Sequence, residues 1–425
     1  MRLAEMFEWT SKKGVLEDSI NWWNPGKTSQ WQKDGIDLVM DKREGYYFYD
    51  MDGKQLMDVH LNGGTYNLGH RNPEIIATLK EALDDFDIGN HHFPAMTRAK
   101  LAKEMAKCTP DALNYTIFSS GGSEAIDAAI KCARYATKRK KIVSIQNGYH
   151  GHTGLAVSLG NERYSRPFLS EGDPDEFLHV PFNDIEAMEQ ALRFEEVAGV
   201  VIETVPATYG FPMPKRDYLN SVKRMCEKYG TLFVADEVQT GLMRTGKLWG
   251  IEHYGVEPDI LVTSKGLSGG IYPIGATVVS KKAGNWMNED GFAHISTFGG
   301  SELGCIVALK VLEISQRQEV RQNVDFVARY VRTGLEQIKQ QYSDFFVGIR
   351  QLGVVMGLEF SHPKGAIYVM QSLYKNGVWA IYSMLDNRVL QFKPGLLLDK
   401  GYCDELLSRC EQSIKQAVKM VYNYS

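Results

Sequence analysis

Residues 231–241 read TLFVADEVQTG, an apolar run that ends directly on two acidic side chains. Residues 231–235 carry only β-branched or apolar side chains. Such a run is typical of a strand that is buried on both faces of a sheet. A carboxylate at its end, at Asp236, is costly to bury unless it meets a cation or a protonated ring, and a helix cap or an ion pair would also serve. The stretch therefore predicts a buried strand with an acid at its carboxyl end.

Similar apolar runs recur along the chain and alternate with segments of helical periodicity. Strands are expected at residues 115–118, 142–145, 198–202, 259–263 and 276–279. Helices are expected over residues 123–135 and 216–229, and Gly230 ends the second one. This alternation indicates an α/β fold with a mainly parallel sheet and helices on both faces. Ligands of such sheets bind at the carboxyl ends of the strands.

The pattern changes after about Leu312. A long amphipathic helix is expected over residues 319–342, strands over 345–360 and a final helix over 404–421. We therefore expect a large domain at residues 71–315 and a smaller α+β domain at residues 316–425. Residues 1–70 are expected to form an N-terminal segment that packs on the smaller domain.

The composition excludes several classes of protein. The 425 residues include 48 Lys and Arg against 52 Asp and Glu, so the overall charge favours neither nucleic acid nor an anionic membrane. No stretch reaches the roughly 18 apolar residues that span a bilayer, and residues 1–13 do not resemble a secretory signal. The six cysteines form no CxxC pair, which argues against a disulfide framework and a zinc site. We expect a cytoplasmic protein with no nucleic-acid, membrane or metal partner.

Forty glycines stand mostly in short clusters between apolar runs, which points to close approach of the backbone to a ligand. One cluster is SSGGSEA at residues 119–125, between an expected strand and an expected helix. Backbone N–H groups at Gly122 and Ser123, together with the positive end of a helix, make an anion site, although a glycine turn with a serine cap is also an ordinary structural motif. No lysine follows the glycine pair as in a nucleotide P-loop, and no GxGxxG follows a strand as in a nicotinamide site.

Lys265 follows the expected strand 259–263 in the glycine-rich run TSKGLSGG at residues 263–270. Most lysines are solvated, but burial at a strand end lowers the pKa of the amine and leaves a neutral nucleophile that can form an imine. Tyr149 lies in GYHG at residues 148–151, where its ring can stack on a planar ligand or pack within a loop. An anion site, a buried acid, an imine-forming lysine and a stacking ring are the parts that pyridoxal phosphate requires.

With these parts identified, the sequence resembles the class III (omega-type) pyridoxal-phosphate aminotransferases of fold type I. The matching segments follow one another over about residues 45–400, at 67–73, 120–131, 148–151, 236–241, 244–246, 258–260, 265–266, 273–276 and 297–300. The resemblance implies a mainly parallel sheet of the seven-stranded type with helices on both faces, and a smaller α+β domain. It also implies pyridoxal 5'-phosphate as the cofactor and a homodimer with shared active sites.

The resemblance assigns roles at the ring of that cofactor. Lys265 would form the internal aldimine and move the proton between the substrate and the cofactor. Asp236 would pair with the pyridinium nitrogen. Val238 and Tyr149 would pack against opposite faces of the ring, and Gln239 would reach its hydroxyl group.

Further roles concern the phosphate and the surroundings of the ring. Gly122 and Ser123 would bind the phosphate, and Thr297 would reach the phosphate of the neighbouring subunit. Glu203 matches the acid that opens the Glu-Pro-Val-type motif of the family. It would support the residues that contact the cofactor without contacting it directly, and a purely structural role is the alternative.

Two positions depart from the family pattern. Many members hold a substrate carboxylate with an arginine where this chain has Gln391, and carry a glutamate partner for that arginine where this chain has Thr208. The joint change is coherent, because loss of the arginine alone would leave a buried unpaired acid. Glutamine cannot replace a guanidinium group at equal strength. Either another cation, such as Arg388, Lys393 or a loop arginine, takes over, or the amino acceptor is less acidic than 2-oxoglutarate.

Aromatic residues in regions that shape the substrate pocket of relatives are candidates for its entrance. They are His91, His92, Phe93, Trp22 and Trp23, with Tyr209, Trp249 and Tyr272 as further candidates. Packing in the core or at an interface is the commoner role of such side chains. Glu302 would either favour an amine-bearing substrate or begin a helix.

Together, these features predict an enzyme that transfers an amino group from a primary amine or amino acid to a keto or aldehyde acceptor, through a pyridoxamine intermediate. A racemase or epimerase and a decarboxylating transaminase of the same family are alternatives, because the bond that breaks depends on which one stands perpendicular to the ring. A non-catalytic scaffold on this fold is a third alternative, against which the intact Lys265 argues.

Overall fold

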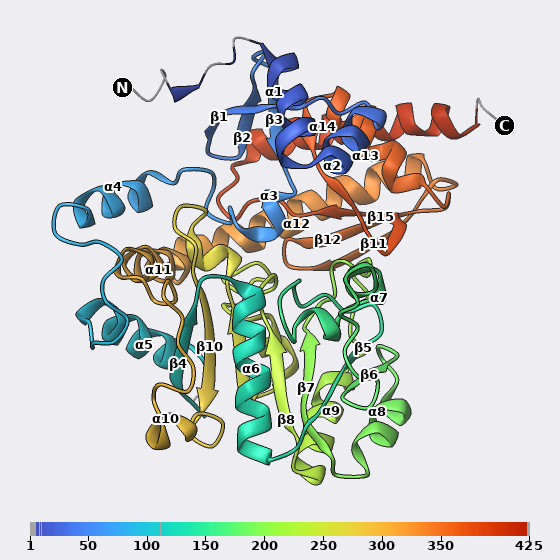
Figure 1. Cartoon of the computed structure of the whole chain (residues 1–425). Helices are drawn as coiled ribbons and strands as arrows, with labels where there is room; N and C mark the ends of the chain where they lie inside the picture. The colour runs from blue at the N-terminus through green and yellow to red at the C-terminus, as the bar shows by residue number, and fades with distance from the viewer. Residues whose placement is uncertain (1–5, 8, 10, 111, 423–425) are drawn as a thin grey trace.

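In the part of the chain that the structure describes, the strands form three β-sheets. The computed structural model describes residues 6, 7, 9, 11–110 and 112–422. A seven-stranded sheet occupies the lower half of Figure 1, and two four-stranded sheets lie in the upper half with the N- and C-terminal parts of the chain. The expectation for residues 1–13 falls partly on residues 1–5, 8 and 10, which lie outside the described residues.

The central sheet is mainly parallel, as the sequence predicts. Its strands stand in the order β4 (Leu113–Ser119), β10 (Gly275–Ser280), β9 (Ile260–Thr263), β8 (Leu232–Asp236), β7 (Val197–Glu203), β5 (Lys141–Ile145) and β6 (Phe177–Val180). Only β10 runs antiparallel to its neighbours, β4 and β9. All six expected strands are confirmed, and β6 was missed because its sequence, FLHV, is short and carries a polar residue.

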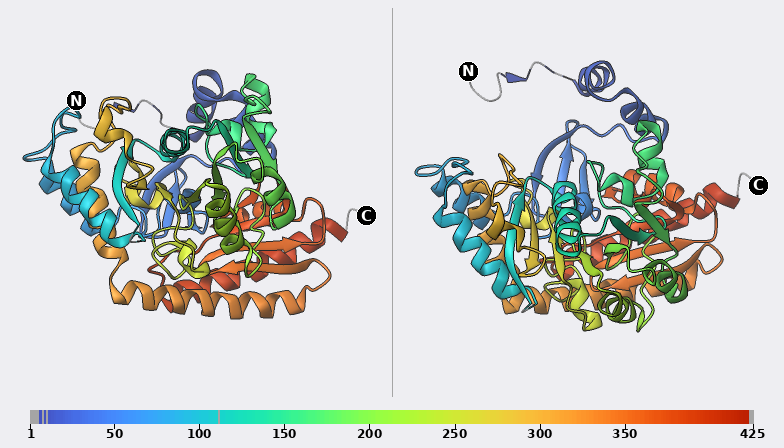
Figure 2. Two further views of the ribbon diagram at one scale, coloured as in Figure 1. Left: turned by 90° about the horizontal axis from the view of Figure 1, so that it is seen from below. Right: turned by 60° about the horizontal axis from the view of Figure 1, so that its bottom comes forward.

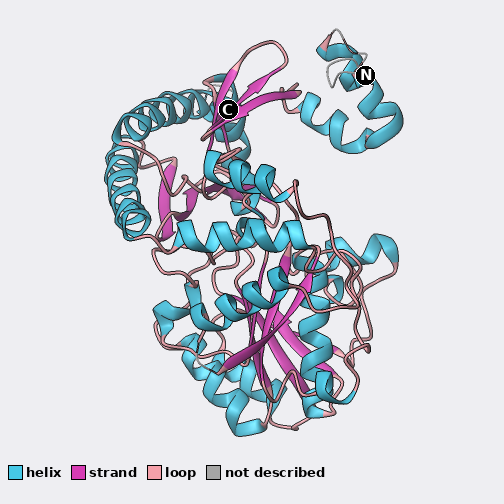
Figure 3. Cartoon of the chain, turned by 90° about the vertical axis from the view of Figure 1, so that its left-hand side faces the viewer, coloured by secondary structure: helices cyan, strands magenta, loops and turns pink. Residues whose placement is uncertain are grey.

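Both faces are buried in the middle of this sheet, which explains why β7, β8 and β9 are almost wholly apolar before their last residues. In β8, Leu232 and Val234 pack in the cluster that contains helix α6 (Gly122–Thr137). The alternate residues Phe233 and Ala235 pack in the cluster that contains helix α9 (Tyr218–Tyr229). Figure 3 shows helices on both sides of the sheet. The α9 helix ends at Gly230, whose φ of 65° has the left-handed geometry expected of a glycine cap.

The C-terminal part contains an antiparallel sheet covered by long helices. Its strands stand in the order β11 (Phe346–Leu352), β12 (Val355–Phe360), β15 (Asp386–Phe392) and β14 (Ile381–Ser383). The helices are α12 (Gln318–Gln341), α13 (Gly365–Lys375) and α14 (Lys400–Tyr422). Helix α12 runs along the lower edge of the molecule in the left view of Figure 2. The expected helices at 319–342 and 404–421 and the strands within 345–360 are confirmed.

The N-terminal part is joined to the C-terminal part by a shared sheet. Strands β1 (Met40–Glu44), β2 (Tyr47–Asp50) and β3 (Gln55–Asp58) form an antiparallel meander. The edge strand β3 then pairs in parallel with β13 (Val378–Trp379). This pairing agrees with an N-terminal segment that packs on the C-terminal region, while the domain boundaries at residues 70 and 315 stay a prediction.

The remaining helices connect or cover these sheets. They are α1 (Lys12–Asp18), α2 (Pro25–Lys33), α3 (Leu61–Gly64), α4 (Pro73–Ala82), α5 (Met96–Cys108), α7 (Glu162–Ser165), α8 (Ile185–Leu192), α10 (Trp286–Glu289) and α11 (Glu302–Ser315). Within the described residues, none of the helices combines the length and apolar character needed to cross a membrane.

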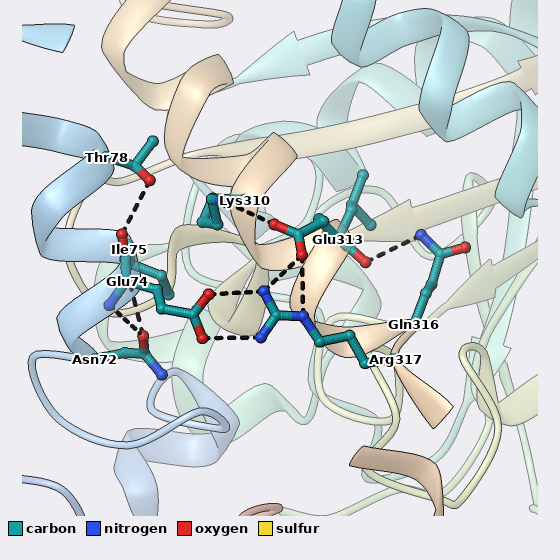
Figure 4. A network of polar contacts seen from close by, with 9 residues as sticks. Asn72, Glu74, Ile75, Thr78, Lys310, Glu313, Gln316 and Arg317 are labelled. Atoms are coloured by element: carbon teal, nitrogen blue, oxygen red, sulfur yellow. Dashed lines mark hydrogen bonds and ion pairs between the residues drawn. The ribbon is translucent and has the colours of Figure 1, made fainter. Parts of the chain in front are cut away.

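A surface network fixes the start of α4 against the end of α11 (Figure 4). Arg317 donates two parallel hydrogen bonds to the Glu74 carboxylate, at 2.8 and 2.6 Å, and also bonds Glu313. The Asn72 side chain caps α4 by accepting the Glu74 backbone N–H. These groups are partly exposed, so the network sets the packing of the two helices more than the overall stability.

Candidate active site

One cavity brings together eight of the nine residues predicted to bind the cofactor. It has a volume of about 340 Å³ and lies where β7, β8 and β9 end and α6 begins. The predicted residues that line it are Gly122, Ser123, Tyr149, Glu203, Asp236, Val238, Gln239 and Lys265. The position agrees with the rule that ligands of such sheets bind at the carboxyl ends of the strands.

The start of α6 forms one wall of this cavity. The Ser123 hydroxyl oxygen accepts the backbone N–H groups of His152 and Thr153, at 2.8 and 3.1 Å. The loop packs so closely that a Cβ atom at Gly151, whose φ is +115°, would lie 1.8 Å from that oxygen. Ser123 can therefore still donate its O–H group, beside the positive end of the helix, to an anion in the cavity.

Asp236 ends strand β8 and holds a buried histidine that sequence reasoning missed. Its Oδ2 atom lies 2.8 Å from Nδ1 of His150, and its Oδ1 atom accepts the Val238 N–H at 3.0 Å. Burial alone would lower the pKa of His150, but the hydrogen bond and charge of Asp236 outweigh it and raise that pKa. The only local signal for His150 was its place beside Tyr149 in the GYHG run.

Glu203 ends the neighbouring strand β7 and lies beside Asp236 in the sheet register. Its Oε2 atom accepts the backbone N–H of Tyr149 at 3.0 Å. Burial raises the pKa of Glu203 from 4.5 to about 7, with the charge of Asp236 adding to the shift and His150 opposing it. This carboxyl group is therefore protonated in only part of the molecules near neutral pH.

The raised pKa of Glu203 predicts a specific pH dependence of stability. Between pH 4.5 and about 7 the folded state binds more protons than the unfolded state, so the free energy of unfolding falls as the pH rises through this window. The full difference corresponds to about 3 kcal/mol. The Glu203→Gln variant of the cofactor-free chain should lose this decline, which urea unfolding at a series of pH values would measure.

The exposed Glu186 at the start of α8 provides the matched control. Glu186→Gln should keep the pH dependence of the original chain. Parallel curves for the original chain and Glu203→Gln would contradict the assignment of the titration to Glu203.

Lys265 follows strand β9 and begins a short 3-10 turn, Lys265–Ser268. Its φ of 37° is unusual for a residue with a side chain, so the fold holds this lysine in a strained backbone conformation. A Cβ atom at Gly63 would lie 3.0 Å from Cε of Lys265, so only glycine fits there without displacing the lysine. Burial lowers the pKa of Lys265, while the charges of Asp236 and Glu203 oppose the shift.

Gln239 lines the cavity, but two of the candidate substrate-side residues lie behind it. Nζ of Lys393 donates to Oε1 of Gln239 at 2.9 Å and to Oε1 of Gln391 at 2.6 Å. Neither Lys393 nor Gln391 lines the cavity. Arg388 lies within strand β15, is half exposed and bonds Asp386. Each candidate cation named from the sequence by number thus has protein partners already.

The remaining predicted residues lie outside the cavity of this chain. Thr297 is exposed, Trp23 is 68% exposed, and Thr208 is half-buried with its backbone carbonyl bonded to Leu385. His92 lines a separate cavity of about 300 Å³ beside α10. Their roles in substrate binding, and that of Thr297 at a partner's phosphate, stay predictions.

Two other sequence candidates have structural contacts. Trp249 is buried and donates from Nε1 to the backbone carbonyl of Cys108 at 2.6 Å. Glu302 is the first residue of α11 and accepts the Thr97 hydroxyl at 3.1 Å. Within the described residues, no group of three or more His, Cys, Asp and Glu side chains is arranged to hold a metal ion.

Comparison with known proteins places this geometry in a family. The family described as Aminotransferase class-III matches residues 28–414. An uncharacterized aminotransferase of Archaeoglobus fulgidus is 45% identical over 415 residues, which cover 96% of each protein. A putrescine aminotransferase of Pectobacterium atrosepticum is 30% identical over 398 residues, covering 91% of this chain and 82% of that protein.

Solved structures agree with these relationships. A transaminase from the marine bacterium Virgibacillus superposes with a TM-score of 0.88 at 26% identity, covering 96% of this chain and all of the other. The ornithine aminotransferase of Toxoplasma gondii shows the same fold, with a TM-score of 0.87 at 23% identity and 98% coverage of both chains. The chain belongs to the class III aminotransferases and is an enzyme that transfers amino groups.

Proposed function

We propose that the cavity holds pyridoxal 5'-phosphate and that its lining residues act on this cofactor as the sequence predicts. The donor set fits the group: the start of α6 with Ser123 suits the phosphate, Asp236 suits a protonated ring nitrogen, and Lys265 supplies the amine. Gly151 packs against Ser123 with no room for a side chain, so backbone atoms of Gly151 form that end of the cavity. When bound, the cofactor supplies an electron acceptor for the bond that breaks at the substrate carbon.

Each side chain then has a definite task. Nζ of Lys265 carries the cofactor and afterwards, as a free amine, moves a proton to and from the substrate carbon. The Asp236 carboxylate keeps a proton on the ring nitrogen, and His150 orients that carboxylate by its 2.8 Å bond. Tyr149 and Val238 bound the ring, and Gln239 bonds its hydroxyl group. The observation that carries the proposal is the meeting of Lys265, Asp236 and Ser123 in one cavity.

We also propose that the amino donor carries no carboxylate at the position that the family arginine recognises. Gln391 is bonded to Lys393 instead of facing the cavity, and Arg388 is bonded to Asp386. The relative from Pectobacterium atrosepticum is named for putrescine, a diamine. A charge-assisted hydrogen bond contributes about 1.5–3 kcal/mol. Without the guanidinium group, the preference of the site for glutamate over a donor that lacks this carboxylate should therefore be smaller by roughly 10- to 100-fold.

Donor half-reactions test this preference. The loaded enzyme is mixed with 1,4-diaminobutane or with L-glutamate alone, and the loss of visible cofactor absorbance is followed. We expect the diamine to react at least about 10-fold faster per unit concentration, because its recognition needs no guanidinium group. Faster reaction of glutamate would contradict the interpretation of Gln391. Loss of substrate chirality without amino transfer would contradict transamination itself.

We further propose that two copies of the chain form a homodimer in the cytoplasm, with Thr297 reaching the partner's phosphate site. Thr297 is exposed and stands beside Phe298, which is 60% exposed. Phe292 and Phe93, both 66% exposed, provide further apolar surface that a second copy would cover. All six cysteines are free, which suits a reducing compartment.

A further inference from the structure

A second lysine is buried directly behind the active-site cavity. Lys393 follows strand β15 and has no exposed surface. Its Nζ atom donates to two side-chain oxygens, Oε1 of Gln239 at 2.9 Å and Oε1 of Gln391 at 2.6 Å. Within the described residues, it forms no ion pair with any carboxylate, which is unusual for a buried lysine.

The surroundings of Lys393 destabilise its charged form. Burial lowers the pKa of Lys393 far below its ordinary value, and the positive charges of Arg244 and Lys265 add to this effect, while Asp58 opposes it. The two glutamine oxygens accept two of its N–H groups, and Nζ lies 5.7 Å from the centroid of the Phe211 ring. Polar oxygens and a ring face, not a carboxylate, therefore hold this amine.

This arrangement decides which end of the Gln239 side chain faces the cavity. The carboxamide oxygen of Gln239 is the atom turned toward Nζ of Lys393, and Gln391 also presents its oxygen, so the lysine donates in both bonds. Gln239 also lines the cavity, and in the described part of the chain its Nε2 atom donates to no other group. The NH2 group is therefore the end available to a ligand.

We propose that Lys393 is a positioning residue that fixes the carboxamide of Gln239 with its NH2 group directed into the cavity. The proposal rests on the proposed role of Gln239 at the ring hydroxyl of the cofactor. Lys393 is separated from the cavity by the side chain that it holds, so it acts through Gln239 and not by touching the substrate. Without Lys393, the carboxamide is free to rotate and to present its oxygen, which repels the ring oxygen.

The test compares Lys393→Met, Gln239→Leu and the double variant as loaded full-length enzymes. The first measurement is the cofactor dissociation constant by equilibrium dialysis, and the second is the pH midpoint of the visible cofactor absorbance. Each single variant should weaken cofactor binding roughly 3- to 10-fold. Each should also move the midpoint to higher pH, because a donor to an ionised ring oxygen favours the deprotonated form. The double variant should resemble Gln239→Leu alone.

Two further variants separate positioning from simple packing. Lys393→Gln, which keeps an N–H donor, should recover part of the affinity. Lys223→Met removes a partly buried lysine that pairs with Asp259 away from the cavity, and it should leave both measurements within about 2-fold of the original enzyme.

Three results would overturn the proposal. If Lys393→Met keeps the cofactor affinity and pH midpoint of the original enzyme while Gln239→Leu changes them, the positioning role is refuted and the role of Gln239 stands. Additive losses in the double variant would show that Lys393 acts by packing and not through Gln239. Original values in Gln239→Leu would refute the role of Gln239 itself, and the inference with it.

Discussion

Replacing Lys265 by alanine should lower the rate of amino transfer by at least about 10⁴-fold, the upper range for loss of a group that transfers protons. The loss should be larger than for any other single substitution, because one nitrogen atom both carries the cofactor and moves the proton. The fold supports this assignment by its strained φ of 37° and by the burial that lowers the pKa of Lys265. Activity is measured by steady-state kinetics with a saturating donor.

A second measurement separates the two tasks of Lys265. After treatment with borohydride, the original enzyme should retain one covalently attached cofactor per chain by intact mass, whereas Lys265→Ala should retain none. The exposed Lys281 provides the control, and Lys281→Ala should keep both the attached mass and the activity. Covalent attachment in Lys265→Ala would assign the amine to a different lysine.

Replacing Asp236 by asparagine should lower kcat/KM by roughly 10²- to 10⁴-fold. Asparagine keeps the shape of the side chain and an oxygen for the Val238 N–H, but it removes the charge that keeps the ring nitrogen protonated. The hydrogen bond and charge of Asp236 also raise the pKa of His150. NMR titration of the cofactor-free variant should therefore show the His150 pKa moving downward.

Asp259 is the matched control for this change. It accepts the Phe233 backbone N–H at 2.8 Å and the Lys223 ammonium at 3.0 Å, and it does not line the cavity. Asp259→Asn should cost about 1 kcal/mol of stability without a comparable loss of rate. An equal loss of rate in the two variants would show that the Asp236 effect comes from misfolding.

The sequence was sufficient to predict the part of the site that depends on local order along the chain. Asp236 is the last residue of the apolar strand β8, and Lys265 stands two residues after the apolar strand β9. The carboxyl ends of parallel strands meet at one edge of a sheet. A short apolar run with a polar residue at or just after its end is therefore enough to predict that this polar residue lies at the carboxyl edge of the sheet. The direction of β10 was not predictable in this way, because an apolar run has the same composition in a parallel or an antiparallel strand.

The contacts that adjust the site could not be predicted, because they join distant parts of the chain. His150 meets Asp236 across 86 residues, and Lys393 meets Gln239 across 154 residues. No periodicity or spacing reports such pairs. Lys393 was considered as a replacement cation for a substrate carboxylate, and only its burial behind Gln239 shows that the two glutamines already occupy it.

The pairing of β3 with β13 has a consequence for synthesis on the ribosome. About 320 residues separate Asp58 from Val378. At a translation rate of roughly 5–20 residues per second, β13 is therefore synthesised about 16–64 s after β3, and the edge of β3 is unpaired during that time. During this time the meander exposes unpaired backbone groups that can join with other strands. Nascent chains of this enzyme should therefore be most prone to aggregate before residue 378 emerges, which makes this interval the one in which a chaperone is most useful.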